Sequence, residues 1–387
     1  AEGSGEKIVI YTANDEHHEA DFIVTNVADL IDNHGFEYKD VAVFYRTNNQ
    51  SRSVEEVFIR RGVPYKVVGG TRFYERKEIK DALAYLRAVS NPEDDVSVRR
   101  ILNTPRRGIG DKAEEAVEGF ARREKITFSA ALNRLSEIHT LPTRSATALA
   151  EFNRLLGNLR TLDESGAGPS AILEAAMEAS GYLKELTASK DPQDEVRVEN
   201  IAELENVTRE YEEQFAEDND SDEVATLSNF LERVSLVADS DQIPTGEEHG
   251  GVVTLMTLHT AKGLEFPVVF LTGMEDGVFP HQRALGSATE LEEERRLAYV
   301  GMTRAMKRLY LSRAVARSTW GQPNYNPESR FLSEIPAELV DRQGEEPGPL
   351  GLSGSGYSKP TKRDEPVMVL EVGDRVLHDK FGMGTVT

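Results

Sequence analysis

The chain has 387 residues, enough for two or three domains that each have their own core. It contains no cysteine, which excludes disulfides and cysteine-ligated zinc and fits a reducing compartment. The formal net charge of −22 argues against binding a polyanion through overall charge, so any such binding must depend on local sites. No apolar run approaches the roughly 18 residues that span a bilayer, so we expect a cytoplasmic protein without membrane contact.

The first 70 residues alternate between strand and helix patterns. Apolar runs predict three strands, and two segments with helical spacing of apolar residues separate them. In chain order these are a strand at 7–11, a helix at 16–33, a strand at 40–46, a helix at 50–62 and a strand at 65–70. This order is typical of a parallel sheet covered by helices.

The pattern changes after Gly70. From Glu78 to about Val237, nearly every segment has helical periodicity. Strand patterns return at 251–259 and 267–273, followed by a helix at 290–306 and a strand at 308–312. We therefore predict a parallel-sheet domain, residues 1–75 and 250–336, that is interrupted by an all-α insertion, residues 76–249.

The composition changes again after Pro336. Residues 337–365 are rich in Gly, Pro, Ser and charge, which predicts a disordered linker. Residues 366–387 alternate and turn at Gly382-Met383-Gly384, like the first strands of a small β-barrel. The expected fold class is thus α/β with a large helical insertion and a short, truncated β tail.

Two groups of candidate residues follow predicted strands. Tyr45 and Arg46 end one strand at the edge where parallel sheets bind ligands, although a surface tyrosine and a salt-bridged arginine would give the same pattern. Thr257 and His259 share a face near the end of another strand and could donate to a phosphate. Glu265 follows a Lys-Gly-Leu turn, where a carboxylate can accept a hydrogen bond from a ribose hydroxyl; a solvated Glu and a structural His are the alternatives.

Arg304 lies at the C-terminal end of the helix that we predict at 290–306. A guanidinium that reaches a γ-phosphate from a second domain accelerates phosphoryl transfer by roughly 10³- to 10⁵-fold. An arginine that only stabilises the helix dipole, worth about 0.3–1 kcal/mol, would have the same spacing.

The segment "TPRRGIGD" has two glycines around Ile109, directly before a helix that begins near Asp111. Backbone N–H groups at such a turn can bind phosphate without net positive charge, and Arg106 and Arg107 precede Gly108 and Gly110. A glycine-rich connector between helices is the alternative.

Together, these segments resemble the C-terminal half of a UvrD/PcrA/Rep-type superfamily 1 DNA helicase, over nearly the whole chain. "FYRTNNQSR" resembles the family's motif IV, "TLHTAKGLEFPVVFLTGMEDGVFP" motif V and "EEERRLAYVGMTRAMKRLYL" motif VI. The resemblance implies a RecA-like 2A domain that carries the helical 2B domain as an insertion. It also implies that the tail begins a Tudor-like module.

The resemblance further implies a role for each candidate residue. Tyr45 would stack on adenine, Arg46 and Arg304 would reach the γ-phosphate, and Glu265 would hold the ribose. Single-stranded DNA would meet Thr257 and His259. The duplex backbone would meet the turn formed by Arg106, Arg107, Gly108, Ile109 and Gly110.

The family's phosphate-binding loop does not occur in this sequence, because it contains no Gly-Lys dipeptide. ATP and Mg²⁺ would therefore be held mainly by the N-terminal 1A and 1B domains of the same protein, and we expect no metal ligands here. We expect a 3′–5′ DNA helicase or translocase of repair or replication, associated with the nucleoid, with RNA polymerase or repair proteins as candidate partners. A RecB/AddA-like helicase-nuclease and a regulatory, protein-binding fragment without chemistry are the alternatives.

Overall fold

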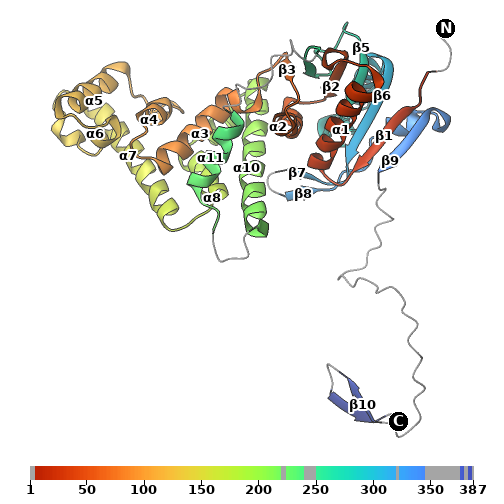
Figure 1. The fold of residues 1–387 in the computed structure, drawn as a ribbon. Helices are drawn as coiled ribbons and strands as arrows, with labels where there is room; N and C mark the ends of the chain where they lie inside the picture. The colour runs from red at the N-terminus through yellow and green to blue at the C-terminus, as the bar shows by residue number, and fades with distance from the viewer. Residues whose placement is uncertain are drawn as a thin grey trace. The chain divides into compact units, whose positions relative to one another are not determined.

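The computed structural model describes residues 5–218, 224–238, 250–319, 322–344, 375–378 and 382–385. The chain divides into two compact units, residues 1–346 and residues 347–387. Within the first unit, helices and strands form two groups, one all-helical and one built around a sheet (Figure 1).

The sheet-building elements come from both ends of the first unit. The first part contains β1 (Ile8–Ala13), α1 (Glu16–His34), β2 (Val41–Tyr45), α2 (Ser51–Arg61) and β3 (Tyr65–Val68). The second part contains β4 (Val253–Thr257), β5 (Phe266–Leu271), α12 (Ala288–Met302), β6 (Ala305–Ala314), β7 (Arg317–Thr319), β8 (Gln322–Asn324) and β9 (Val340–Gly344). Gly35 and Gly62 end α1 and α2 in left-handed conformations, as is common at helix C-termini.

Seven strands form one parallel sheet in the order β3-β4-β2-β5-β6-β1-β9. Alternate residues of β2 point to opposite faces, as the period of two requires. Val43 and Tyr45 pack into the core that α1 and α2 cover. Ala42 and Phe44 pack into the core that α12 covers. Both faces are buried, which explains why the strands read as continuous apolar runs.

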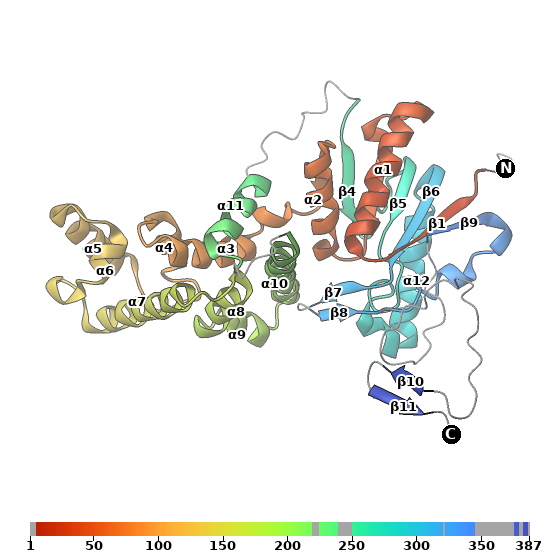
Figure 2. The same cartoon turned by 60° about the horizontal axis from the view of Figure 1, so that its bottom comes forward.

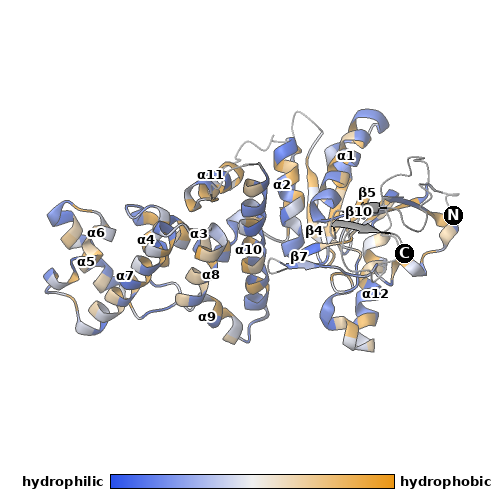
Figure 3. Cartoon of the chain, turned by 90° about the horizontal axis from the view of Figure 1, so that it is seen from below, coloured by the Kyte–Doolittle hydropathy of each residue, from blue (hydrophilic) through white to orange (hydrophobic). Residues whose placement is uncertain are grey.

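The helical group lies between β3 and β4 in the sequence and has its own hydrophobic core. Its members are α3 (Lys77–Ser90), α4 (Asp95–Ile101), α5 (Asp111–Glu124), α6 (Phe128–Leu132), α7 (Thr143–Glu164), α8 (Pro169–Ala179), α9 (Tyr182–Ala188), α10 (Pro192–Asp218) and α11 (Leu227–Ala238). Hydrophobic and hydrophilic residues are interspersed along these helices (Figure 3). This is the pattern of amphipathic helices that bury one side.

A buried arginine joins the helical group to the sheet group. Arg52 on α2 is 1% exposed and donates to both oxygens of Glu210 on α10, at 3.1 and 3.0 Å. It also donates to Glu203 on α10. A buried guanidinium is tolerated only when it is paired in this way, so Arg52 fixes α10 against α2.

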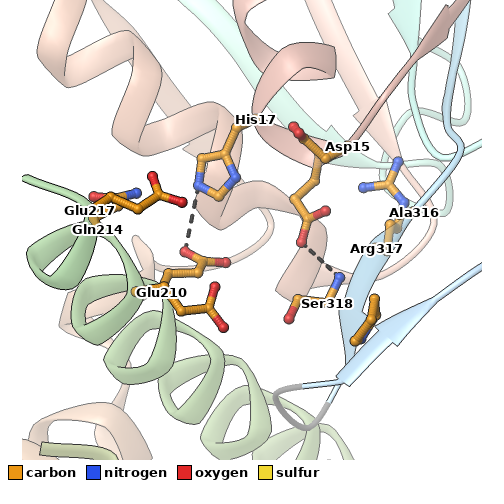
Figure 4. Close-up of a pocket in the computed structure, with 11 residues that line it drawn as sticks. Asp15, His17, Glu210, Gln214, Glu217, Ala316, Arg317 and Ser318 are labelled. Carbon is orange, nitrogen blue, oxygen red and sulfur yellow. Dashed lines mark hydrogen bonds and ion pairs between the residues drawn. The ribbon is translucent and has the colours of Figure 1, made fainter. Parts of the chain in front are cut away.

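A second set of contacts lies beside this junction (Figure 4). The imidazole of His17 lies 3.5 Å from the carboxylate of Glu210, and the backbone N–H of Ser318 donates to Glu16 at 3.0 Å. Asn206 of α10 donates to the backbone carbonyl of Ser318 at 3.0 Å, which attaches α10 to the β7–β8 hairpin (Figure 2). The same junction therefore fixes α1, α10 and the hairpin.

The structure corrects two predictions about the end of the chain. Residues 340–344 are not linker, because they form β9 and pair with β1 at the edge of the sheet. Gly382-Met383-Gly384 is not a turn, because it lies in β11 (Gly382–Thr385), which pairs antiparallel with β10 (Arg375–His378). The remaining residues between 345 and 374 lie outside the described residues.

Candidate functional site

The predicted site residues divide between the two edges of the sheet. Tyr45 of β2 is in register with Thr257 of β4, so Arg46 lies at the carboxyl edge, beside Thr257. Phe266 of β5 is in register with Ala305 of β6, and its N–H donates to the carbonyl of Arg304 at 2.9 Å. Because all strands are parallel, Arg304 and Glu265 lie at the opposite, amino edge.

Arg46 is held at the carboxyl edge by a carboxylate that the sequence analysis did not single out. Its Nε lies 3.0 Å from each oxygen of Glu294, and its Nη2 lies 2.8 Å from Oε1. Burial acts to raise the pKa of Glu294, but the bonds from Arg46 and from the N–H of His281 hold this pKa below its usual value. The helical spacing could have shown that Glu294 lies on the buried side of α12. Glu294 follows Leu291 by three residues and precedes Ala298 by four, and both of these residues pack into the core.

Two imidazoles lie near this ion pair. Burial and the positive charge of Arg46 lower the pKa of His259. The same two causes, with Arg283, lower the pKa of His281. Both rings are therefore neutral at pH 7 and can donate or accept hydrogen bonds without adding charge. Thr257 shares a hydrogen bond of 3.0 Å with Thr260, so its hydroxyl is oriented locally.

A cavity of about 450 Å³ opens at the carboxyl edge beside these residues. Its polar lining combines hydroxyl, amide, imidazole and guanidinium groups with three carboxylates, and comprises Glu16, Thr47, Asn49, Gln50, Ser53, Glu199, Glu203, His281, Gln282, Arg283, Arg317, Ser318, Asn324 and Asn326. The side-chain oxygen of Gln50 accepts from the N–H groups of Arg46 and Thr47, each at 2.9 Å. Its buried Nε2 has no hydrogen-bond partner within the described part of the chain. Amides of this kind match the donors and acceptors of nucleobases.

Gly273 lies directly against Gln50, which lines this cavity. Its φ is +71°, and an added Cβ would lie 2.2 Å from Nε2 of Gln50. A side chain at this position would displace Gln50, which orients the backbone between Arg46 and Thr47.

The structure does not support base stacking by Tyr45. Its ring is 0% exposed and packs under α1 and α2, so it presents no face to a ligand. Burial and Glu55 raise the pKa of its hydroxyl, which therefore stays protonated. The prediction overlooked the period of two, which places Tyr45 on the same covered face as Val43.

Arg304 and Glu265 are brought together at the amino edge. Nη1 of Arg304 lies 3.9 Å from the carboxylate of Glu265. The arginine is oriented by bonds to the carbonyls of Val300 at 3.1 Å and Leu264 at 3.3 Å. The side chain of Glu265 is 60% exposed, so its oxygens face solvent and can accept a hydrogen bond from a ligand.

The two arginines do not share one site. Along the sheet they are separated by roughly eight strand residues, on the order of 25 Å at 3.3 Å per residue. A phosphate group is far smaller than this distance. The geometry of this structure therefore does not support the predicted contact of Arg46 with the same γ-phosphate as Arg304.

The glycine turn before α5 is partly as predicted. Arg106, Gly108 and Gly110 are exposed, while Ile109 is 4% exposed and anchors the turn in the helical core. Gly108 has a φ of +74°, and Gly110 precedes the first residue of α5, so backbone N–H groups are available there.

Arg107 differs from the prediction that it contacts DNA directly. Its Nη1 donates to the carbonyls of Ile101, Leu102 and Pro105, and its Nη2 donates to the hydroxyl of Tyr85. The guanidinium N–H groups of Arg107 are therefore used within the fold, where they stabilise the turn.

The residues present fit part of a nucleotide. An arginine beside an exposed carboxylate suits a phosphate and a ribose hydroxyl. Among the described residues there is no group of three or more His, Cys, Asp or Glu that could hold a metal ion.

No helix in the described ranges combines the length and apolar character of a membrane span.

A parallel sheet with an arginine at one edge, a polar cavity at the other and a helical insertion between its halves defines a RecA-like motor domain of the helicase class. The family described as the UvrD-like helicase C-terminal domain matches residues 1–316, and the chain belongs to this family.

Similar proteins support this assignment. The chain is 54% identical over 405 residues to ATP-dependent DNA helicase UvrD1 of Mycobacterium tuberculosis, covering 99% of this chain and 52% of that protein. It is 41% identical over 399 residues to ATP-dependent DNA helicase PcrA of Bacillus subtilis, with 99% and 52% covered. It is 39% identical over 385 residues to DNA helicase II of Haemophilus influenzae, with 99% and 51% covered. The chain spans about half the length of these relatives.

Proposed function

We propose that this chain is the C-terminal motor half of an ATP-dependent 3′–5′ DNA helicase or translocase that acts in repair or replication. The observation that carries the proposal is the pair formed by Arg304 and Glu265 at the amino edge of the sheet. The names of the relatives, which are ATP-dependent DNA helicases, support it. The polarity and the pathway follow from family resemblance.

Arg304 is better placed than Arg46 to bind a phosphate. Its guanidinium is 20% exposed and is already oriented by two carbonyls, so little side-chain entropy is lost when it meets the charge of the transition state. Glu265 would accept from the ribose. Mg²⁺ and most of the triphosphate would be held by the 1A domain of the same protein, because this chain supplies neither a phosphate-binding loop nor a metal cluster in its described part.

The carboxyl edge would bind single-stranded DNA. Thr257, His259 and the amide groups of the cavity offer uncharged hydrogen bonds, whereas Glu16, Glu199 and Glu203 in the same lining would oppose a phosphate. Exposed Gly108 and Gly110, with the N-terminus of α5, would contact the duplex backbone. Arg46 would act indirectly, by holding α12 through Glu294.

The chain would act in the cytoplasm at the nucleoid, with the N-terminal 1A and 1B domains as its partners in the same protein. Binding of RNA polymerase or repair proteins remains part of the proposal for the tail at 366–387. The relatives compared above are UvrD-, PcrA- and helicase II-type proteins, so we do not propose a helicase-nuclease.

The proposal is tested by ATP hydrolysis of this chain alone, with and without single-stranded DNA. Half of a nucleotide site should give no DNA-stimulated turnover above background. Turnover that follows the protein through purification and disappears in Arg304→Ala would show that the chain is complete in itself, contrary to the proposal.

A further inference from the structure

The arginines of this acidic chain are unevenly paired. In the described ranges, most arginines lie within 4.0 Å of a carboxylate. The exceptions gather between residues 106 and 160, and there they are Arg106, Arg107, Arg144, Arg154 and Arg160. Among the other arginines whose side chains the structure describes, only Arg72, Arg87 and Arg233 share this property. The unpaired arginines of this chain of −22 are thus concentrated in one part of the helical insertion.

A cavity lies in this region, on the helical insertion and away from the sheet. Its volume is about 530 Å³, and its polar lining comes from Arg107, Glu151, Arg154, Asn158 and Ser180. Most of these residues belong to α7, and Ser180 ends α8. The guanidinium of Arg107 lies 5.1 Å from the ring centre of Phe152, so its charge is fixed at the cavity wall although its donors are used within the fold.

The cavity continues the surface of the glycine turn. Nη2 of Arg144 lies 4.0 Å from the position that a Cβ of Gly108 would occupy. From Arg144, the residues Ala148, Glu151, Leu155 and Asn158 recur at intervals of three and four, so they form one side of α7. Arg154 borders this side. One surface therefore runs from the turn at Gly108 along α7 to the cavity.

The dimensions suit a nucleic-acid backbone. Arg144 and Arg154 are ten residues apart, which is about 15 Å along a helix at 1.5 Å per residue. This equals the length of about four base pairs along the axis of duplex DNA, at 3.4 Å each. Both side chains are exposed and have no competing carboxylate within ion-pair distance, so they can reach phosphates without first breaking a protein contact.

We propose that the exposed side of α7, with Arg144, Arg154 and the cavity between α7 and Ser180, is a second contact for the phosphate backbone of duplex DNA. It extends the contact at Gly108 and rests on the proposed duplex binding. Glu151 is the one carboxylate in the cavity lining, and it opposes this binding.

The test is fluorescence anisotropy of the 387-residue chain with a blunt 20-base-pair duplex over a salt series. The double variant Arg144→Gln/Arg154→Gln should weaken duplex binding about tenfold at low salt. It should also reduce the slope of log K against log salt by about two, one for each lost phosphate contact. Glu151→Gln should tighten binding a few-fold. Binding of a single strand should stay unchanged in all variants.

The matched control is Arg122→Gln/Arg123→Gln on α5, which removes the same charge from the same insertion at side chains that are 79% and 66% exposed. It should leave duplex binding near the original value. Equal losses in both double variants, or no loss in Arg144→Gln/Arg154→Gln while the chain still binds duplex, would overturn the α7 contact and leave the contact at Gly108 standing. Absence of any duplex binding by the unmodified chain would overturn both.

Discussion

Arg46 and Glu294 form a bidentate ion pair although 248 residues separate them in the sequence. The pair joins the end of β2 to the middle of α12, and α12 ends two residues before Arg304. One helix therefore connects the carboxyl edge, where we place single-stranded DNA, to the amino edge, where we place the nucleotide. A shift of α12 would therefore move residues at both edges of the sheet.

Removing one partner of this pair should destabilise the chain. The side chains are 19% and 8% exposed, so Arg46→Met leaves a poorly solvated carboxylate and should cost about 2–4 kcal/mol of unfolding free energy. Glu294→Gln in the same chain should restore part of this loss. Chemical denaturation measures both. Arg295→Met on the same helix is the control, because its ion pairs are more exposed and should contribute less than about 1 kcal/mol.

The same pair should make stability depend on pH in acid. The pKa of Glu294 is lowered in the folded chain, so its contribution is fully present above the unfolded value near 4.5 and is lost as the pH falls through the folded value. Unfolding free energies between pH 6 and pH 3 should therefore fall less steeply in Glu294→Gln than in the unmodified chain. Parallel curves would show that the carboxylate does not gain from Arg46.

His259 should report the charge of Arg46. Its pKa is lowered by burial first and by Arg46 second, so Arg46→Met should raise it towards 6.5 without fully restoring that value. A proton NMR titration of the imidazole measures this shift. Arg304→Met, at the opposite edge, should leave the pKa of His259 unchanged. A shift of similar size in both variants would mean that Arg46 does not act locally.

Arg52 should control how firmly α10 is attached. Arg52→Met leaves Glu203 and Glu210 without their buried partner, which should cost about 3–5 kcal/mol. Hydrogen exchange should then rise in α10 while β5, in the centre of the sheet, stays protected. Arg60→Met on the same helix is the control, because its side chain is 62% exposed and its partner Asp21 lies on α1. Equal exchange in both variants would contradict the role of Arg52.

Periodicity predicted the helices and the central strands because both faces of the sheet are covered. It missed β9, where only Val340 is apolar in "VDRQG" and pairing with β1 rests on backbone hydrogen bonds. Such an edge strand has no side-chain pattern to detect.

The site was predictable to different degrees. Glu265 and Arg304 meet because the strands that follow them, β5 and β6, are neighbours in the sheet, which the sequence analysis did not predict. The burial of Tyr45 follows from its position in a strand that is covered on both faces, and the continuous apolar run around it could have revealed this. The ion pair of Arg46 with Glu294 depends on where α12 crosses the sheet, and no local pattern contains that information.

The most direct test of the account is the DNA-stimulated ATPase of the full-length protein with Arg304→Ala. The account predicts that kcat falls by roughly 10³- to 10⁵-fold while single-stranded DNA still binds. Arg296→Ala, on the same helix and 68% exposed, should keep full activity. An Arg304→Ala protein that hydrolyses ATP at the unmodified rate would contradict the assignment of the amino edge to the nucleotide.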